Sequence, residues 1–140
     1  MKMLDWLKTP SGVIATSGLS LMSFIARSLL DWRYTFPYLM EMTTGIVAGM
    51  LLWNVLFAAL WVFGMVNLRP DRKAAFRILM SMNVFHLVFN GILSTLAMCP
   101  SPCPTLWPVG EIIIQSGTLT GFLGVLSLWL YRRHNRKFVF

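Results

Sequence analysis

The residues best suited to chemistry in this sequence are one histidine and several polar residues that stand inside apolar segments. Asn83, His86 and Asn90 occupy positions i, i+3 and i+7, so a helix would present them on one face. Ser94 continues this face one turn later. Asn54 lies at a similar depth in the preceding apolar segment, so we expect it to meet the same face. We call Asn54, Asn83, His86 and Asn90 the polar seam.

Three roles are open for the polar seam. Neutral imidazole binds metals, so His86 is a candidate ligand for a haem iron or a chlorophyll magnesium. The side chains can instead join helices through hydrogen bonds, each typically contributing about 0.6 kcal/mol in a membrane. A proton relay is the third role. The hydrogen-bonding role is favoured, because polar groups inside a bilayer normally face protein.

Arg27, Glu41 and Glu111 form a second candidate group. All three fall near the outer ends of apolar segments, where Arg27 and one carboxylate are expected to form an ion pair. An ionisable residue in a membrane helix indicates function by default. Residues this close to the interface can also extend their charged ends into water, and we favour that structural interpretation.

Cys99 and Cys103 are separated by Pro100-Ser101-Pro102. They fall in a connection on the predicted outer side, where an oxidising compartment favours a disulfide. Free thiols and metal or redox chemistry are the alternatives. Thiol redox enzymes of membranes commonly use C-x-x-C with a second cysteine pair, and this sequence has neither.

Other patterns argue against catalysis. The ten methionines include Met80 and Met82, but residues two apart on a helix point about 200° apart, which favours packing over a copper path. The sequence has no nucleotide-binding loop, zinc motif, catalytic triad or haem-attachment motif. We therefore expect no enzymatic activity.

Two glycine stripes predict close helix packing. Gly45 and Gly49 form one G-x-x-x-G motif, and Gly117 and Gly121 form another that Gly124 extends. Such stripes let helix backbones approach within lipid. The motif is common by chance in apolar segments, so it indicates where helices touch and leaves the partner open.

The elements that carry these residues are predicted to be four transmembrane helices in one small bundle. The 140 residues are 56% apolar and 12% charged, against roughly 25% charged in soluble domains. Spanning the hydrocarbon core takes about 20 apolar residues in a helix. Such segments cover residues 13–30, 38–66, 76–98 and 109–131, in a single membrane domain.

Lys2 and Lys8 before the first segment resemble the start of a signal peptide. The only small-x-small site, which a signal peptidase would need, includes Arg27, so we interpret this segment as a retained helix.

The distribution of basic residues predicts the orientation. Ten of the twelve Lys and Arg residues fall on one side of four alternating crossings, leaving only Arg27 and Arg33 for the other. The positive-inside rule therefore predicts that both termini are cytoplasmic, and a bacterial inner membrane is the expected location. The net charge of +7 sits at the ends of apolar runs, which indicates lipid headgroups as partners and argues against nucleic acid.

Two classes of function fit these features, and a third is weaker. The first is a non-catalytic accessory or assembly subunit of a larger membrane complex, in a respiratory or photosynthetic system for example, with the second and fourth segments as contact faces. The second is a small oligomeric transporter or channel, whose pathway would need the polar seam. The third is a haem- or quinone-binding membrane protein.

Overall fold

A computed structural model describes residues 2–30, 44–69, 71–96 and 107–135, which form five helices and no strand. In chain order these are α1 (Lys2–Leu7), α2 (Pro10–Leu30), α4 (Thr44–Val66), α5 (Lys73–Leu96) and α6 (Trp107–His134). Four of them, α2, α4, α5 and α6, are long and apolar enough to cross a membrane. The predicted all-helical membrane class is therefore confirmed, whereas the side of the membrane that each end faces stays a prediction.

The predicted segments 13–30, 38–66, 76–98 and 109–131 correspond to α2, α4, α5 and α6. Residues 38–43 and 97–98 lie outside the described part of the chain. α6 begins at Trp107 with Pro108 in its first turn, where the missing N–H costs no helical hydrogen bond. Prolines are tolerated at such starts, which explains how a proline-rich connection leads directly into a long helix.

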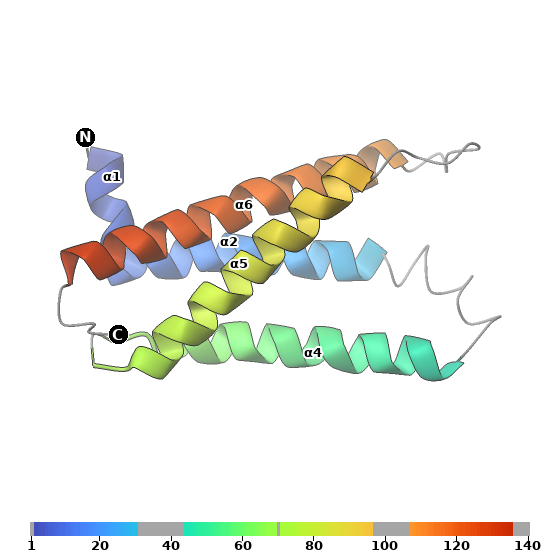
Figure 1. The fold of residues 1–140 in the computed structure, drawn as a ribbon, viewed down its shortest axis with the longest axis horizontal. Coiled ribbons are helices and arrows are strands. Elements are labelled where there is room, and N and C mark those ends of the chain that lie inside the picture. The colour runs from blue at the N-terminus through green and yellow to red at the C-terminus, as the bar shows by residue number, and fades with distance from the viewer. Residues whose placement is uncertain (1, 31–43, 70, 97–106, 136–140) are drawn as a thin grey trace.

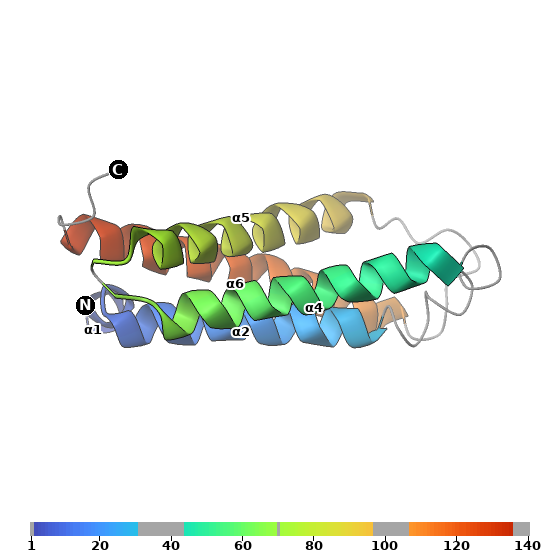
Figure 2. The same ribbon diagram turned by 90° about the horizontal axis from the view of Figure 1, so that it is seen from below.

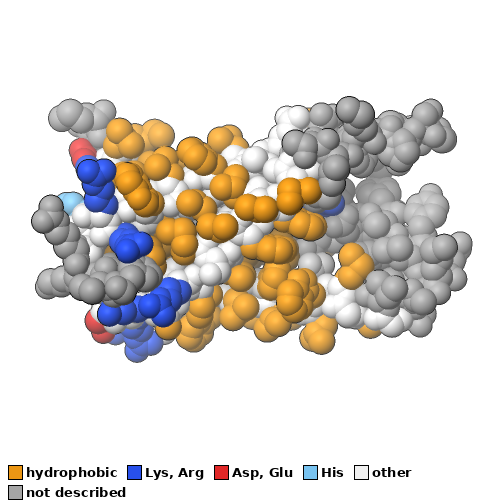
Figure 3. All heavy atoms as spheres, in the orientation of Figure 1, with side chains coloured by type: hydrophobic (Ala, Val, Ile, Leu, Met, Phe, Trp, Pro, Cys, Tyr) orange, Lys and Arg blue, Asp and Glu red, His pale blue; other side chains and the backbone are white. Residues whose placement is uncertain are grey.

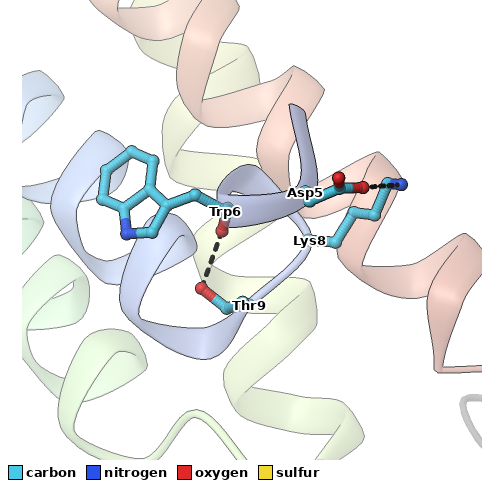
Figure 4. Close-up of polar contacts among 4 residues, drawn as sticks. All are labelled: Asp5, Trp6, Lys8 and Thr9. Atoms are coloured by element: carbon cyan, nitrogen blue, oxygen red, sulfur yellow. Dashed lines mark hydrogen bonds and ion pairs between the residues drawn. The ribbon is translucent and has the colours of Figure 1, made fainter. Parts of the chain in front are cut away.

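The short helix α1 was not expected, and it meets α2 at a sharp angle (Figure 1). Thr9 caps α2: its Oγ1 accepts a hydrogen bond from the Gly12 N–H at 3.1 Å and donates to the Trp6 carbonyl at 2.7 Å. Lys8 forms an ion pair with Asp5 at 2.7 Å, as Figure 4 shows. These contacts stop α1 and start α2 within three residues.

The bundle is organised around α6, which packs along both α2 and α5 (Figures 1 and 2). α4 packs against α5 and α2 and, among the described residues, makes no contact with α6. α4 and α5 approach closely near the turn that joins them, where a Cβ on Gly64 would lie 2.7 Å from the Leu79 side chain. Towards the other end of the bundle α5 diverges from α4 (Figure 1).

Two features of the surface match a membrane protein. Apolar side chains cover the middle of the face drawn in Figure 3, while Lys and Arg side chains gather at one end. At that end lie the α1–α2 junction, the turn at residues 67–72 and the last turn of α6. One basic end is what the sequence predicts for the cytoplasmic side.

Candidate functional site: a polar core and an intramembrane cavity

Small hydroxyl residues join α2 to α6 in the centre of the bundle. Thr16 and Ser127 share a hydrogen bond of 2.6 Å, and Ser20 Oγ donates to the Thr120 carbonyl at 2.9 Å. Thr16, Ser20 and Ser127 are buried, so these bonds form away from lipid. Small hydroxyl side chains at an interface allow close approach and supply hydrogen bonds between membrane helices.

Asn83 connects α5 to the same core. Its Nδ2 donates to Ser17 Oγ on α2 at 3.1 Å and to the Leu79 carbonyl of its own helix at 2.8 Å. Asn83 and Ser17 have no exposed surface. One member of the polar seam therefore joins two helices through a hydrogen bond, which is the role favoured from the sequence.

The glycines of α6 pack against Asn83, Leu87 and Asn90 of α5. A Cβ on Gly117 would lie 2.9 Å from Asn90 Cγ, and one on Gly124 would collide with the Asn83 amide. A Cβ on Gly121 would lie 2.9 Å from the Leu87 backbone nitrogen. This stripe is therefore used inside the chain's own bundle, which corrects the expectation that the fourth segment offers it to a partner.

The glycines of α4 are placed differently. Gly45 and Gly49 are exposed, and no atom of the described residues lies within 4 Å of a Cβ built on either. Of the four candidate spans, the one in α4 has the smallest buried share, 17% against 33–39% for the other three. The stripe of the second segment therefore stays open.

His86 and Asn90 form a pair whose geometry defines the state of the imidazole. Asn90 Nδ2 donates to the His86 carbonyl at 2.8 Å, which orients the amide. The same nitrogen lies 3.0 Å from His86 Nδ1, so Nδ1 is the acceptor. A neutral imidazole then carries its proton on Nε2. That Nε2 is buried and has no hydrogen-bond partner.

Aromatic rings surround this histidine. Its ring centroid lies 5.4 Å from that of Trp61 and 6.2 Å from that of Phe24, both in edge-to-face arrangements. These rings offer at most a weak aromatic contact in place of a hydrogen bond. The Nε2–H group of His86 is thus a buried donor in an apolar environment, which costs free energy until an acceptor reaches it.

A cavity of about 250 Å³ lies between α2, α4 and α5. Asn54, His86 and Asn90 all line it, so three of the four polar-seam residues meet there as expected. The other eight lining residues are one cation, one hydroxyl residue and six apolar residues. They are Arg27, Ser28, Phe24, Met50, Trp53, Phe57, Phe85 and Phe89. We call this space the α2–α4–α5 cavity.

The tautomer inferred from the Asn90 contact bears on the metal-ligand interpretation of His86. A histidine that binds a metal through one ring nitrogen normally donates the N–H of the other to an acceptor. Here Nδ1 accepts from Asn90, and Nε2 carries the proton that a metal would have to replace. The arrangement fits a hydrogen-bond donor better than a haem or chlorophyll ligand.

The other predicted site residues are placed as follows. Arg27 lines the cavity, whereas Glu41 and the side chain of Glu111 lie outside the described residues, so the expected ion pair stays a prediction. Cys99 and Cys103 lie outside them too, as does the side chain of Ser94.

Sequence reasoning missed the hydroxyl residues of α2. Thr16, Ser17 and Ser20 were not among the candidate site residues, although all three are buried against α5 or α6. Their spacing of i, i+1 and i+4 places them on one side of a helix, which was the available signal. The aromatic wall of the cavity had no comparable signal, because rings are common throughout the apolar segments.

Comparison with known proteins adds no relative: no family model, no curated protein and no solved structure matches this chain. We therefore infer the function from the geometry of the bundle.

Proposed function

We propose that this chain is a non-catalytic accessory or assembly subunit of a larger membrane protein complex, and that α4 docks on a helix of another subunit. The supporting observation is the open glycine stripe on the least buried span. A second apolar helix is the occupant with matching chemistry.

The proposed contact face follows one side of α4 along its length. Positions spaced by three or four residues share a helix face, and every residue on this one is exposed. The residues of this docking face are Gly45, Ala48, Gly49, Leu52, Leu56, Ala59 and Phe63. Lipid alone gains nothing from small residues, whereas a neighbouring helix gains close van der Waals contact over Gly45, Ala48 and Gly49.

The transport alternative has less support. A transport pathway needs polar groups that line a continuous space. Asn83 instead donates a hydrogen bond to Ser17, and Gly124 packs directly against its side-chain amide. Thr16 and Ser127 likewise satisfy each other. These polar groups join helices, which is the role that an interaction subunit needs for its own stability.

The proposal is tested by blocking the docking face. Leucine at Gly45 or Gly49 fills the space needed by a neighbouring helix while keeping the segment apolar. Gly91→Leu on α5 is the matched control, because nothing lies within 4 Å of a Cβ there either. Membranes of the native host, solubilised in mild detergent, are separated on native gels and probed for the tagged chain.

We expect a large band for the unmodified chain and for Gly91→Leu, and a shift to a small band for Gly49→Leu. Co-purification of two differently tagged copies distinguishes a foreign partner from self-association. An unmodified chain that migrates alone, or a complex that survives substitution of both glycines, would overturn the proposal. Copies that co-purify and transport a solute in liposomes would replace it with the transporter alternative.

A further inference from the structure

The α2–α4–α5 cavity is separate from the docking face, because none of the α4 residues that line it (Met50, Trp53, Asn54 and Phe57) belongs to that face. Its lining side chains come from three helices, α2, α4 and α5. Trp53 and Phe89 both line the cavity and are 55% and 44% exposed. These two lining rings are thus partly exposed at the surface of the bundle, and we expect a lipid-soluble molecule to enter past them.

The inner part of the cavity supplies a hydrogen-bond donor that the protein itself does not use. His86 is 1% exposed, and its Nε2 has no partner. Asn90 holds the imidazole in the tautomer that carries the proton on Nε2. A ligand oxygen that accepts this N–H would relieve a buried unsatisfied donor.

Two further residues of the lining select the charge of that ligand. Arg27 and Asn54 both line the cavity. A cation in this apolar space disfavours cationic ligands and favours oxygens that carry partial or full negative charge. The complementary group is a carbonyl or a carboxylate.

The aromatic lining selects the shape of the ligand. Four rings form a continuous row: Trp53 and Phe57 have centroids 4.6 Å apart, Phe57 and Phe85 4.8 Å, and Phe85 and Phe89 5.5 Å. Phe85 and Phe89 are nearly parallel, with an interplanar angle of 12°. A flat unsaturated ring gains stacking and edge contacts with such a row, whereas a saturated acyl chain gains only burial.

We propose that the α2–α4–α5 cavity binds a lipid-soluble flat ring that bears carbonyl oxygens, the chemistry of a quinone. The ring packs against the aromatic row, and a carbonyl oxygen accepts the hydrogen bond of His86 Nε2–H. Arg27 and Asn54 lie on the same lining and stabilise the electron-rich oxygens. The protein acts as a binding subunit, and no electron transfer within the chain is implied.

The first experiment compares ligands on the unmodified chain in lipid nanodiscs. Tritiated 2,3-dimethyl-1,4-naphthoquinone is the probe, and empty nanodiscs give the partition background. We expect saturable binding of one probe per chain. Unlabelled 2,3-dimethylnaphthalene has the same ring without carbonyls and should compete at least about tenfold more weakly, because the donors lose their acceptors. The proposal would be overturned if the probe shows no saturable binding, or if the hydrocarbon competes as well as the quinone. Stronger competition by oleate would also overturn it and would assign the cavity to a fatty acid.

The second experiment removes the donor. His86→Phe keeps a ring and should weaken probe binding about tenfold, whereas His86→Gln keeps an N–H donor and should stay within about threefold. His134→Phe, at the exposed end of α6, is the same chemical change outside the cavity and should leave binding unchanged. A folded His86→Phe variant that binds like the unmodified chain would contradict the proposal. If His86→Phe does not fold, the ligand comparison and His86→Gln decide the question.

Discussion

Gly124 of α6 lies directly against the side-chain amide of Asn83 on α5, so a Cβ at residue 124 would occupy the space of the amide oxygen. The amide cannot move aside at low cost, because Asn83 also donates to Ser17 and to the Leu79 carbonyl. A glycine on one helix and a hydrogen-bonded asparagine on another thus pack tightly against each other in the α5–α6 interface.

Gly124→Ala should therefore destabilise the folded bundle by about 1–3 kcal/mol, the cost of overpacking a filled interior. The free energy of unfolding is measured in detergent micelles by denaturant titration. Gly91→Ala is the control, since its Cβ meets open space and alanine favours the helix. Equal stabilities of the two variants would show that the α5–α6 contact is looser than described.

The hydrogen bond between Asn83 and Ser17 should be measurable by a double-mutant cycle with Asn83→Ala and Ser17→Ala. Hydrogen bonds between membrane helices average about 0.6 kcal/mol and reach about 1.7 kcal/mol, so the coupling free energy should fall in this range. Ser116 bonds only to the Ile113 carbonyl of its own helix, so a cycle of Asn83→Ala with Ser116→Ala should be additive. A coupling free energy of zero between Asn83 and Ser17 would show that this hydrogen bond does not stabilise the bundle.

Loss of the Thr9 cap should loosen the start of α2. Thr9→Ala removes the oxygen that accepts the Gly12 N–H, and N-cap losses cost about 1 kcal/mol. We expect faster hydrogen exchange at the amides of the first turn of α2, with little change in α5 or α6. Ser11→Ala is the neighbouring control, since Ser11 is exposed. Unchanged exchange in Thr9→Ala would mean that packing of α1, and not the cap, defines this helix start.

The orientation prediction is tested with topology reporters fused at Asp71 and after Phe140. Because the basic residues lie mostly on one side, both fusions should report the cytoplasm. A fusion within residues 99–108 should report the opposite side. A non-cytoplasmic signal from Asp71 would reverse the predicted orientation, although the four-helix bundle would stand.

The sequence alone determined which segments are long and apolar enough to cross a membrane and which polar residues of the third segment share one face. Length and hydropathy decide insertion locally, so the four spans follow from runs of apolar residues between charged or proline-rich breaks. The helical spacing of Asn83, His86 and Asn90 likewise predicted a shared face, and all three are buried. The similar depth of Asn54 in the adjacent segment predicted that it faces the same space, and Asn54, His86 and Asn90 line one cavity.

Only the tertiary structure decided which helix each face meets. The two glycine stripes look alike as motifs, yet Gly121 is packed against the Leu87 backbone while Gly49 faces open space. Likewise, only the contact with Asn90 assigns the proton of His86 to Nε2, and only the packing of α2, α4 and α5 leaves a cavity for His86 to line. The physical reason is that insertion of a helix into a membrane depends on the composition of that one segment. Packing between helices depends on the shapes of two surfaces, and the order of residues in one segment does not specify the surface that it will meet.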